Sequence, residues 1–162
     1  MPINAFIESL LESLQSIQLA TLNNLGQADI SYTPFLYIKK AETRAFYIFI
    51  SDLAKHTANI KYANKLSAMF IQDEISAKNI FARERLILEC KTELISRDTD
   101  TWSNVLTAFE LKHGKTVGVL KTLPDFHLFQ LTTLSGNFVQ GFGKAYKLTG
   151  KNLMNFEQQT TR

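Results

Sequence analysis

Residues 83–97, with the sequence RERLILECKTELISR, alternate between apolar and polar side chains along most of their length. A period of two is the pattern of a β-strand that buries one face and exposes the other. The pattern therefore predicts a sheet-based fold and also predicts which side chains point inward. The buried face is expected to carry Leu86, Leu88, Cys90, Thr92 and Leu94, with Glu89, Lys91 and Glu93 on the opposite face.

Further strand patterns occur before and after this segment. The run IQLATLNNLGQADISYTPF has two alternating stretches on either side of residues 23–26, where Gly26 takes a positive φ easily, so a β-hairpin is expected. Pro34 indicates that the second strand bends or reaches an edge, because proline cannot donate to a ladder. The runs AFYIFI and KLSAMFIQ predict two buried strands. The run DFHLFQLTTLSGNFVQGFGKAYKL predicts two more, around Leu134, Ser135 and Gly136.

Helical signals lie between the strands. Apolar residues at helical spacing, capping side chains and a following glycine mark the beginnings and ends of three helices. The expected helices are 5–15, with Asn4 as its N-cap, 53–63, capped by Ser51 or Asp52, and 99–113, with Asp100 or Thr101 near its start and Gly114 past its end.

Six or seven antiparallel strands with two or three helices are typical of a closed or nearly closed β-barrel with helical additions. The fold class is therefore expected to be mainly β. The chain has 162 residues, no linker and no internal repeat, so one domain covering residues 1–162 is expected. Its predicted parts are an N-terminal helix at about 5–15, the barrel at about 16–148 and a short C-terminal tail at 149–162.

The composition argues against several classes of protein. The chain has 18 Lys and Arg residues and 15 acidic residues, which gives a net charge of +3. This small excess does not indicate nucleic-acid binding, for which a clustered basic stripe is expected. No apolar run approaches the roughly 20 residues that cross a bilayer. The start, MPINAFIESLLESLQ, has no basic region of a secretion signal, and the single cysteine cannot form an intrachain disulfide. We expect a cytoplasmic protein with no membrane span and no nucleic-acid partner.

The segment SDLAKHTANIKYA, residues 51–63, gathers several polar side chains directly after a strand. Backbone N–H groups at the start of a helix attract anions, and Ser51, Lys55 and Thr57 could add donors beside His56. One interpretation is the rim of a ligand pocket. The other is a capped helix on the surface with solvated side chains, and the local pattern fits both.

Two further pairs of residues are candidates for chemistry. Arg83 and Arg85 flank Glu84, and period-two alternation would place both guanidinium groups on one face of a strand, where they could bind phosphate or propionate. Asp125 and His127 are also two residues apart, and a carboxylate could orient the imidazole. The alternatives are surface charge for the arginines, and a turn residue beside a packed histidine for the second pair.

Other residues that could suggest function have structural interpretations. Gly141 and Gly143 lack the third glycine and the following helix of a phosphate loop, so a bulge or a tight corner is expected. Cys90 lies on an apolar strand face and is expected to be a buried, inert thiol. His113 is expected to interact with the dipole at the end of its helix.

Four stretches together resemble one family: ATLNNLGQADISYTPF, FYIFISDLAKHTANIKYANKLSAMFIQDE, IFARERLILE and DFHLFQLTTLSGNFVQGFGKAY. In order and spacing they look like the HugZ/HutZ-type haem-utilisation proteins of the pyridoxamine 5'-phosphate oxidase-like split-barrel superfamily. The resemblance implies a six-stranded FMN-binding-type split barrel, a homodimer, and ligand pockets at the subunit interface. It also implies haem binding and, in some members, oxygen-dependent haem breakdown that takes electrons from an external donor and releases iron.

The resemblance also implies roles for single residues. Arg85 matches an arginine near the haem, with Arg83 beside it, and Asp125 matches a carboxylate that approaches the proximal side from the partner subunit. His56 matches a histidine near the dimer interface, while His127 receives no role. The family's proximal ligand is a histidine in a C-terminal tail, and no histidine follows His127 here, so the iron ligand stays open. Met154 is either a substitute ligand or a packing residue.

The wider superfamily implies an alternative ligand, FMN, whose phosphate would be held near Ser51, Lys55 and His56. At the two positions of the second strand where the superfamily carries cations, this chain has Ser31 and Leu36. The loss of two charged hydrogen bonds, worth roughly 1.5–3 kcal/mol each, would weaken FMN binding. A third hypothesis is a haem carrier or storage protein without redox chemistry.

Overall fold

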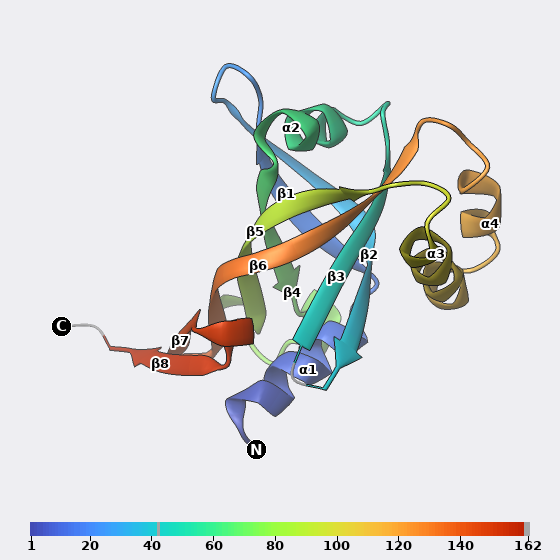
Figure 1. The fold of residues 1–162 in the computed structure, drawn as a ribbon. Coiled ribbons are helices and arrows are strands. Elements are labelled where there is room, and N and C mark those ends of the chain that lie inside the picture. The colour runs from blue at the N-terminus through green and yellow to red at the C-terminus, as the bar shows by residue number, and fades with distance from the viewer. Residues whose placement is uncertain (42, 161–162) are drawn as a thin grey trace.

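The computed structural model describes residues 1–41 and 43–160, and within them one antiparallel sheet holds eight strands (Figure 1). The strand order is β3-β2-β1-β4-β5-β6-β7-β8, and an additional pairing between β3 and β6 closes the first six strands into a barrel. The strands are β1 (Ser16–Leu22), β2 (Ala28–Lys40), β3 (Thr43–Ser51), β4 (Lys65–Ile71), β5 (Arg85–Ile95), β6 (Phe126–Gly141), β7 (Lys144–Thr149) and β8 (Asn155–Gln159).

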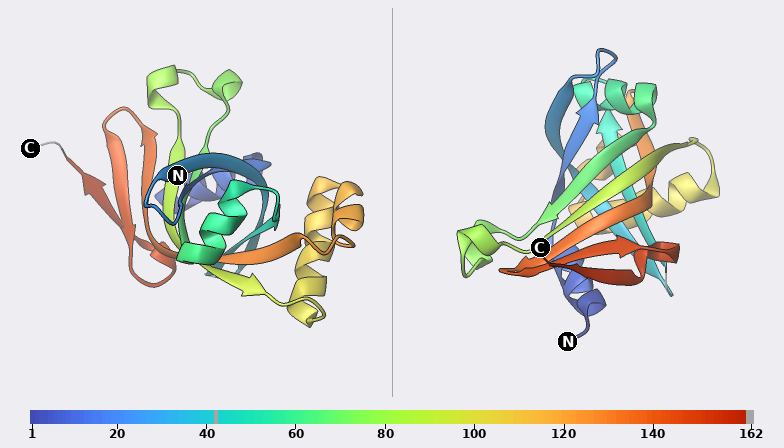
Figure 2. Two further views of the ribbon diagram at one scale, coloured as in Figure 1. Left: turned by 90° about the horizontal axis from the view of Figure 1, so that it is seen from above. Right: turned by 90° about the vertical axis from the view of Figure 1, so that its left-hand side faces the viewer.

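Four α-helices and three short 3₁₀ turns complete this described part of the chain. Helix α1 lies below one end of the barrel, and α2 lies across the other end, as the view down the barrel shows (Figure 2). Helices α3 and α4 pack on the outside, beside β2 and β3. The elements are α1 (Ile3–Ser13), α2 (Lys55–Ala63), α3 (Asp100–His113), α4 (Thr116–Leu120), η1 (Glu74–Ser76), η2 (Ile80–Ala82) and η3 (Lys151–Leu153).

Strand β2 passes Pro34 without a break and changes its neighbour there. Pro34 is the last residue opposite β1, where it faces Ser16, and Phe35 is the first residue opposite β3, where it faces Ile48. A residue without an N–H is tolerated at such an exchange of partners because fewer ladder bonds are required of it. The exchange lets one long strand serve both neighbours in the closed barrel.

The inward face of β5 is the one that the alternation predicts, with one exception. Leu86, Leu88, Cys90 and Thr92 are buried, but Leu94 is exposed. The prediction for Leu94 is wrong because β4 begins at Lys65, opposite Lys91, so the last residues of β5 extend beyond the neighbouring strand that would help to enclose them.

The prediction of a turn at residues 134–136 is also wrong, because β6 runs through them without a break. Glu89 pairs with Ser135 and Cys90 with Thr133, so Leu134 is an extra residue in a bulge. Gly136 is small for a packing reason: a Cβ atom there would lie 2.8 Å from Leu88 Cδ2. The chain turns instead around Gly143, which has φ +67°, next to a shift in register between Val139 and Gly141. The expected irregularity at Gly141 and Gly143 is confirmed.

The helix boundaries correct two predicted caps, whereas Asp100 and Thr101 lie at the start of α3 as expected. Helix α1 begins at Ile3 after Pro2, and Asn4 lies inside it rather than capping it. Helix α2 begins at Lys55 without a side-chain cap, so neither Ser51 nor Asp52 caps it. Helix α3 is capped by Thr99, whose Oγ1 accepts a hydrogen bond from Trp102 N, and it ends before Gly114 as expected.

The predicted tail is not without structure: strand β8 pairs with β7 and both project from the barrel (Figure 1). The last two residues of the predicted tail, 161 and 162, lie outside the described residues. In the part of the chain that the structure describes, no helix is long and apolar enough to span a bilayer.

Candidate functional site

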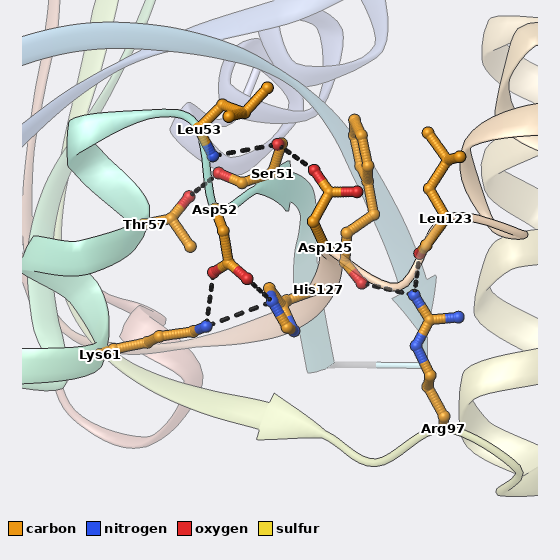
Figure 3. Close-up of polar contacts among 10 residues, drawn as sticks. Ser51, Asp52, Leu53, Thr57, Lys61, Arg97, Leu123, Asp125 and His127 are labelled. Atoms are coloured by element: carbon orange, nitrogen blue, oxygen red, sulfur yellow. Dashed lines mark hydrogen bonds and ion pairs between the residues drawn. The ribbon is translucent and has the colours of Figure 1, made fainter.

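The turn between β3 and α2 is tied to the segment that precedes β6 (Figure 3). Ser51 Oγ donates to Asp125 Oδ2 over 2.6 Å and accepts from Leu53 N over 3.1 Å. Asp52 N donates to the backbone oxygen of Asp125 over 2.9 Å, and Thr57 Oγ1 donates to Ser51 O over 2.6 Å. Four of these residues come from the predicted segment 51–63, and the fifth, Asp125, is the predicted carboxylate. The fold therefore brings two separate predictions together.

His56 is buried beneath this turn, with 8% of its surface exposed. Its Nδ1 lies 2.8 Å from Ser31 Oγ. Ser31 stands where the superfamily carries a cation that binds phosphate, and in this chain it hydrogen-bonds to His56 instead. Burial lowers the pKa of His56 below its ordinary value, since the charged imidazolium would lose hydration. The neutral ring is thereby favoured. Leu36, at the other position of an expected cation, is buried among apolar side chains.

A cavity of about 370 Å³ lies between the barrel wall, the start of α2 and the helices α3 and α4. That volume falls within the range of small-molecule sites. Most of its lining is apolar, and two histidines, His56 and His113, contribute ring nitrogens to it. The lining residues are Thr33, Pro34, Phe49, Ile50, Ser51, His56, Phe109, His113, Thr116, Val117, Leu120 and Phe126.

His113 contributes to this cavity from the end of α3. Its Nε2 lies 2.8 Å from Phe35 O, and its ring centre lies 4.9 Å from that of Phe109. The expected interaction with the end of its own helix is thus replaced by one with β2. Burial is the main cause that lowers the pKa of His113.

Asp125 and His127 do not pair with each other, and because β6 begins at Phe126, Asp125 is the turn residue of the alternative interpretation. His127 Nε2 instead lies 2.8 Å from Asp52 Oδ2, while Lys61 Nζ lies 2.6 Å from Asp52 Oδ1. The pKa of Asp52 is lowered, first by the hydrogen bond from Lys61 and then by the one from His127. This exposed cluster fastens the turn to α2 and β6 (Figure 3).

Arg97 is a residue of this region that sequence reasoning missed. Its guanidinium donates to the backbone oxygens of Lys121 over 3.0 Å and Phe126 over 2.8 Å. It also donates to the backbone oxygen of Leu123 (Figure 3). It therefore holds the segment that carries Asp125. A single arginine after a strand gives no signal of such a role, because its partners lie more than twenty residues further along the chain.

Arg83 and Arg85 lie at the opposite end of the barrel. Arg83 precedes β5, so the prediction that both arginines share a strand face is wrong; its Nε and Nη2 donate to Gln72 O over 2.8 and 2.6 Å. Arg85 pairs with Ile71 at the end of β4, whereas α2 leads into the beginning of β4. Seven residues of strand span roughly 20 Å. One chain therefore does not bring the arginines to the turn at His56.

Across residues 1–41 and 43–160, no three His, Cys, Asp or Glu side chains lie close enough together to hold a metal ion. The predicted site residues thus form two groups. Ser51, Lys55, His56, Thr57 and Asp125 surround one end of the barrel, and Arg83 and Arg85 lie at the other.

The six-stranded closed barrel with a cavity beside its first inter-strand helix is the architecture of the split-barrel class. The sequence profile of pyridoxamine 5'-phosphate oxidase matches residues 3–140. This chain belongs to that family, and within it is similar to the haem-utilisation proteins. The fold and the family resemblance expected from the sequence are both confirmed.

Three comparisons define this similarity. Haem oxygenase HutZ of Vibrio cholerae serotype O1 is 33% identical over 150 residues, which are 93% of this chain and 83% of HutZ. The crystal structure of HutZ, described as a haem storage protein from Vibrio cholerae, matches with a TM-score of 0.77 at 32% identity, covering 88% of this chain and 98% of that one. The crystal structure of Campylobacter jejuni ChuZ gives 0.80 at 30% identity, covering 93% of this chain and 60% of that one.

Proposed function

We propose that this chain is a cytoplasmic, homodimeric haem-binding protein of haem utilisation. The observation that carries the proposal is the 33% identity to haem oxygenase HutZ over nearly the whole chain, combined with an apolar cavity beside the buried His56. A largely apolar cavity with a few polar groups suits a porphyrin, whose faces are apolar and whose propionates are anionic.

The residues present fit such a ligand. The cavity offers aromatic and aliphatic side chains for the ring, and Lys55 is exposed at the start of α2, where its ammonium group could meet a propionate. Ser51, His56 and Thr57 are proposed to form the polar side of the same site. Arg83 and Arg85 are proposed as further cofactor-binding residues, contributed from the opposite end of a second chain.

Whether the protein degrades haem or stores it distinguishes two forms of the proposal. HutZ itself is described both as a haem oxygenase and as a haem storage protein. Bound haem would supply an iron centre that activates oxygen when an external donor gives electrons. Arg85 and Asp125 are the residues that we propose to act in this reaction by positioning hydrogen bonds around the reacting ring.

The outer face of β1, β2, β4 and β5 is the proposed homodimer interface. Ile30 and Tyr32 project from it with 85% and 69% of their surfaces exposed. Met69 and Ile87 line an apolar hollow on the same face, next to Gln18, whose buried Oε1 has no hydrogen-bond partner within the described residues. Large exposed apolar patches mark interaction sites. A second copy could cover this patch and donate a hydrogen bond to Gln18 Oε1.

Titration of the purified protein with haemin and, separately, with FMN tests the proposed ligand. We expect a saturable Soret shift with haemin, larger than that produced by an unrelated protein, and weak binding of FMN because Ser31 and Leu36 supply no cation. Tight FMN binding with no specific haemin binding would contradict the proposal and favour an FMN-dependent oxidoreductase. Ascorbate added under air then separates the two forms: bleaching of the Soret band supports degradation, and a stable band supports storage.

A further inference from the structure

A second cavity, of about 250 Å³, lies beside helix α1, at the end of the barrel opposite to His56 (Figure 1). Three parts of the chain enclose it: α1, the turn between β2 and β3, and the segment that leads into β8. Arg44 lies near the start of β3 and Ser51 at its end, so this cavity is separate from the one beside His56. The lining residues are Asn4, Glu8, Lys39, Ala41, Thr43, Arg44 and Met154.

Two cations stand opposite each other on the wall of this cavity. Lys39 pairs with Arg44 in the ladder between β2 and β3, so both side chains lie on the same face of the sheet. Tyr37, two residues before Lys39, shares that face and pairs with Phe46. Like charges directly opposite each other destabilise a pair of strands. This part of the wall therefore favours a negative charge beside it.

Glu8 supplies one such charge from α1. Its Oε1 accepts from Arg44 Nε over 3.0 Å, and its Oε2 lies 3.6 Å from Lys39 Nζ. Tyr37 donates its hydroxyl to the same Oε2. Burial, and then the hydrogen bond to Glu8, raise the pKa of Tyr37, so this hydroxyl keeps its proton. Among the described lining residues one carboxylate thus faces two cations, and a net positive charge is left.

The guanidinium of Arg44 has donors to spare. Only 9% of its side chain is exposed, and it is held on one edge by Glu8 and by Asn4, whose Oδ1 accepts from Nη2. A guanidinium has five N–H groups, and Nη1 has no hydrogen-bond acceptor among the residues that the structure describes. Because buried charged donors gain from a partner, an oxyanion in the cavity would bind favourably to this side chain.

The remaining lining indicates what kind of oxyanion fits. Ala41 and Met154 give the cavity an apolar side, and the hydroxyl of Thr43 already donates to Lys40 O over 2.7 Å. Inorganic phosphate needs donors around all its oxygens, whereas a carboxylate needs them at one end only. The volume is slightly below the usual range of small-molecule sites, which limits the carbon chain to a few atoms.

We propose that this cavity binds the anion of a short-chain carboxylic acid, with its carboxylate on Arg44 and Lys39 and its carbon chain against Met154. Glu8 and Asn4 hold the guanidinium in position. The bound acid joins α1 to the β2–β3 turn and to the segment before β8. Met154 thereby has a place as a packing residue of this site. The inference does not rest on the proposed binding of haem, which concerns the other end of the barrel.

Methionine methyl groups report on the site directly, because the chain has three methionines, Met1, Met69 and Met154. Protein that carries ¹³C in its methionine methyl groups is titrated with sodium butyrate without haemin and followed by NMR. The Met154 signal, assigned with Met154→Leu, should shift and saturate. The Met69 signal should not move, because Met69 lies on β4 and outside this cavity. Absence of a saturable shift at Met154, or an equal shift with sodium chloride at the same ionic strength, overturns the proposal.

Two lysine variants that lose the same charge test the contact with the carboxylate. Lys39→Gln should raise the dissociation constant of butyrate by about threefold or more, as expected for a half-exposed charge. Lys40→Gln is the matched control, because Lys40 lies on the opposite face of β2 and does not line the cavity. It should leave the dissociation constant unchanged. Equal effects of the two variants would show that only the general charge of the turn matters and would overturn the proposal.

Arg44→Lys tests the guanidinium, since lysine keeps the charge but lacks the planar arrangement of donors. The dissociation constant of butyrate should rise by about tenfold or more. An affinity equal to that of the parent protein contradicts the assigned role of Arg44. Sodium phosphate is the competing ligand, and tighter binding of phosphate than of butyrate would refute the proposed ligand class. All these measurements are made without haemin, so their outcome and that of the haemin titration are independent.

Discussion

His56 combines burial, a fixed hydrogen bond and a place on the cavity wall. The hydroxyl of Ser31 engages Nδ1, which orients the ring toward a single arrangement. Burial lowers the pKa of His56 and favours its neutral form, so protonation of this ring would place a charge on the cavity wall.

A pH prediction follows from this lowered pKa. The unfolded chain binds the proton near the ordinary value of 6.5, whereas the folded chain resists it. The contribution of His56 to stability is therefore complete above that pH and is lost as the pH falls through the folded pKa. We expect His56→Gln to reduce the drop in the free energy of unfolding between pH 7 and pH 5, measured by urea denaturation. His113→Gln should act in the same direction, and an unchanged drop in the double variant would contradict the argument.

Arg97 offers a second test on the residue scale. Arg97→Lys keeps the charge but cannot donate to three backbone oxygens, so we expect a loss of about 2 kcal/mol or more in the free energy of unfolding. Because this side chain holds the segment with Asp125, haemin affinity should fall as well. Arg44→Lys is the comparison: Arg44 lies in β3 at the other end of the barrel, where its Nε donates to Glu8 Oε1 over 3.0 Å, so this variant should affect stability without changing haemin affinity. Equal effects of both variants on affinity would argue against a local role.

Among the elements, β6 determines how the barrel closes, since it pairs with both β3 and β5. Its passage beside β5 is tight at Gly136, where even a methyl group would collide with Leu88 and approach Ile87 O to 3.2 Å. The bulge at Leu134 and the absence of a side chain at Gly136 together allow the strand to continue.

Gly136→Ala should therefore destabilise the protein by about 1–3 kcal/mol, as overpacking of a core commonly does. Gly118→Ala is the matched control, because the atom that its new methyl group would meet is the flexible end of Glu110. Alanine also favours the helical conformation of α4. Thermal melting of both variants measures the difference, and equal melting temperatures would show that Gly136 is not constrained.

The sequence predicted the strands of the barrel well because period-two alternation reflects burial on one side only, as in β5. It predicted β6 poorly because Leu-Ser-Gly has the composition of a turn, and only packing against Leu88 explains the glycine. The site was predictable in parts. The motif around His56 was found, but the bond between Ser51 and Asp125 joins residues 74 positions apart, and no local pattern specifies such a contact.

For the whole molecule, the proposed homodimer requires a surface on which two barrels can associate. The proposed interface on β1, β2, β4 and β5 exposes the large apolar side chains of Ile30 and Tyr32. That the whole chain forms one domain stays a prediction, and a single domain would present this face as one continuous surface.

The parent protein is expected to have a solution mass of twice 18.4 kDa by light scattering. Tyr32→Asp should shift it toward the mass of one chain, because a carboxylate on an apolar interface loses its hydration. Tyr62→Asp changes an equally exposed tyrosine on α2 and should leave the mass unchanged. A dimer that persists with Tyr32→Asp would place the interface elsewhere.

The buried thiol described above has a practical consequence. Cys90 is the only cysteine of the chain, and burial raises its pKa to about 12, so neither contact with reagent nor ionisation is available in the closed barrel. A thiol-labelling reagent can react with it when β5 leaves its neighbours. The rate of labelling at Cys90 therefore reports how often β5 separates from its neighbours, and it can be compared with and without ligand.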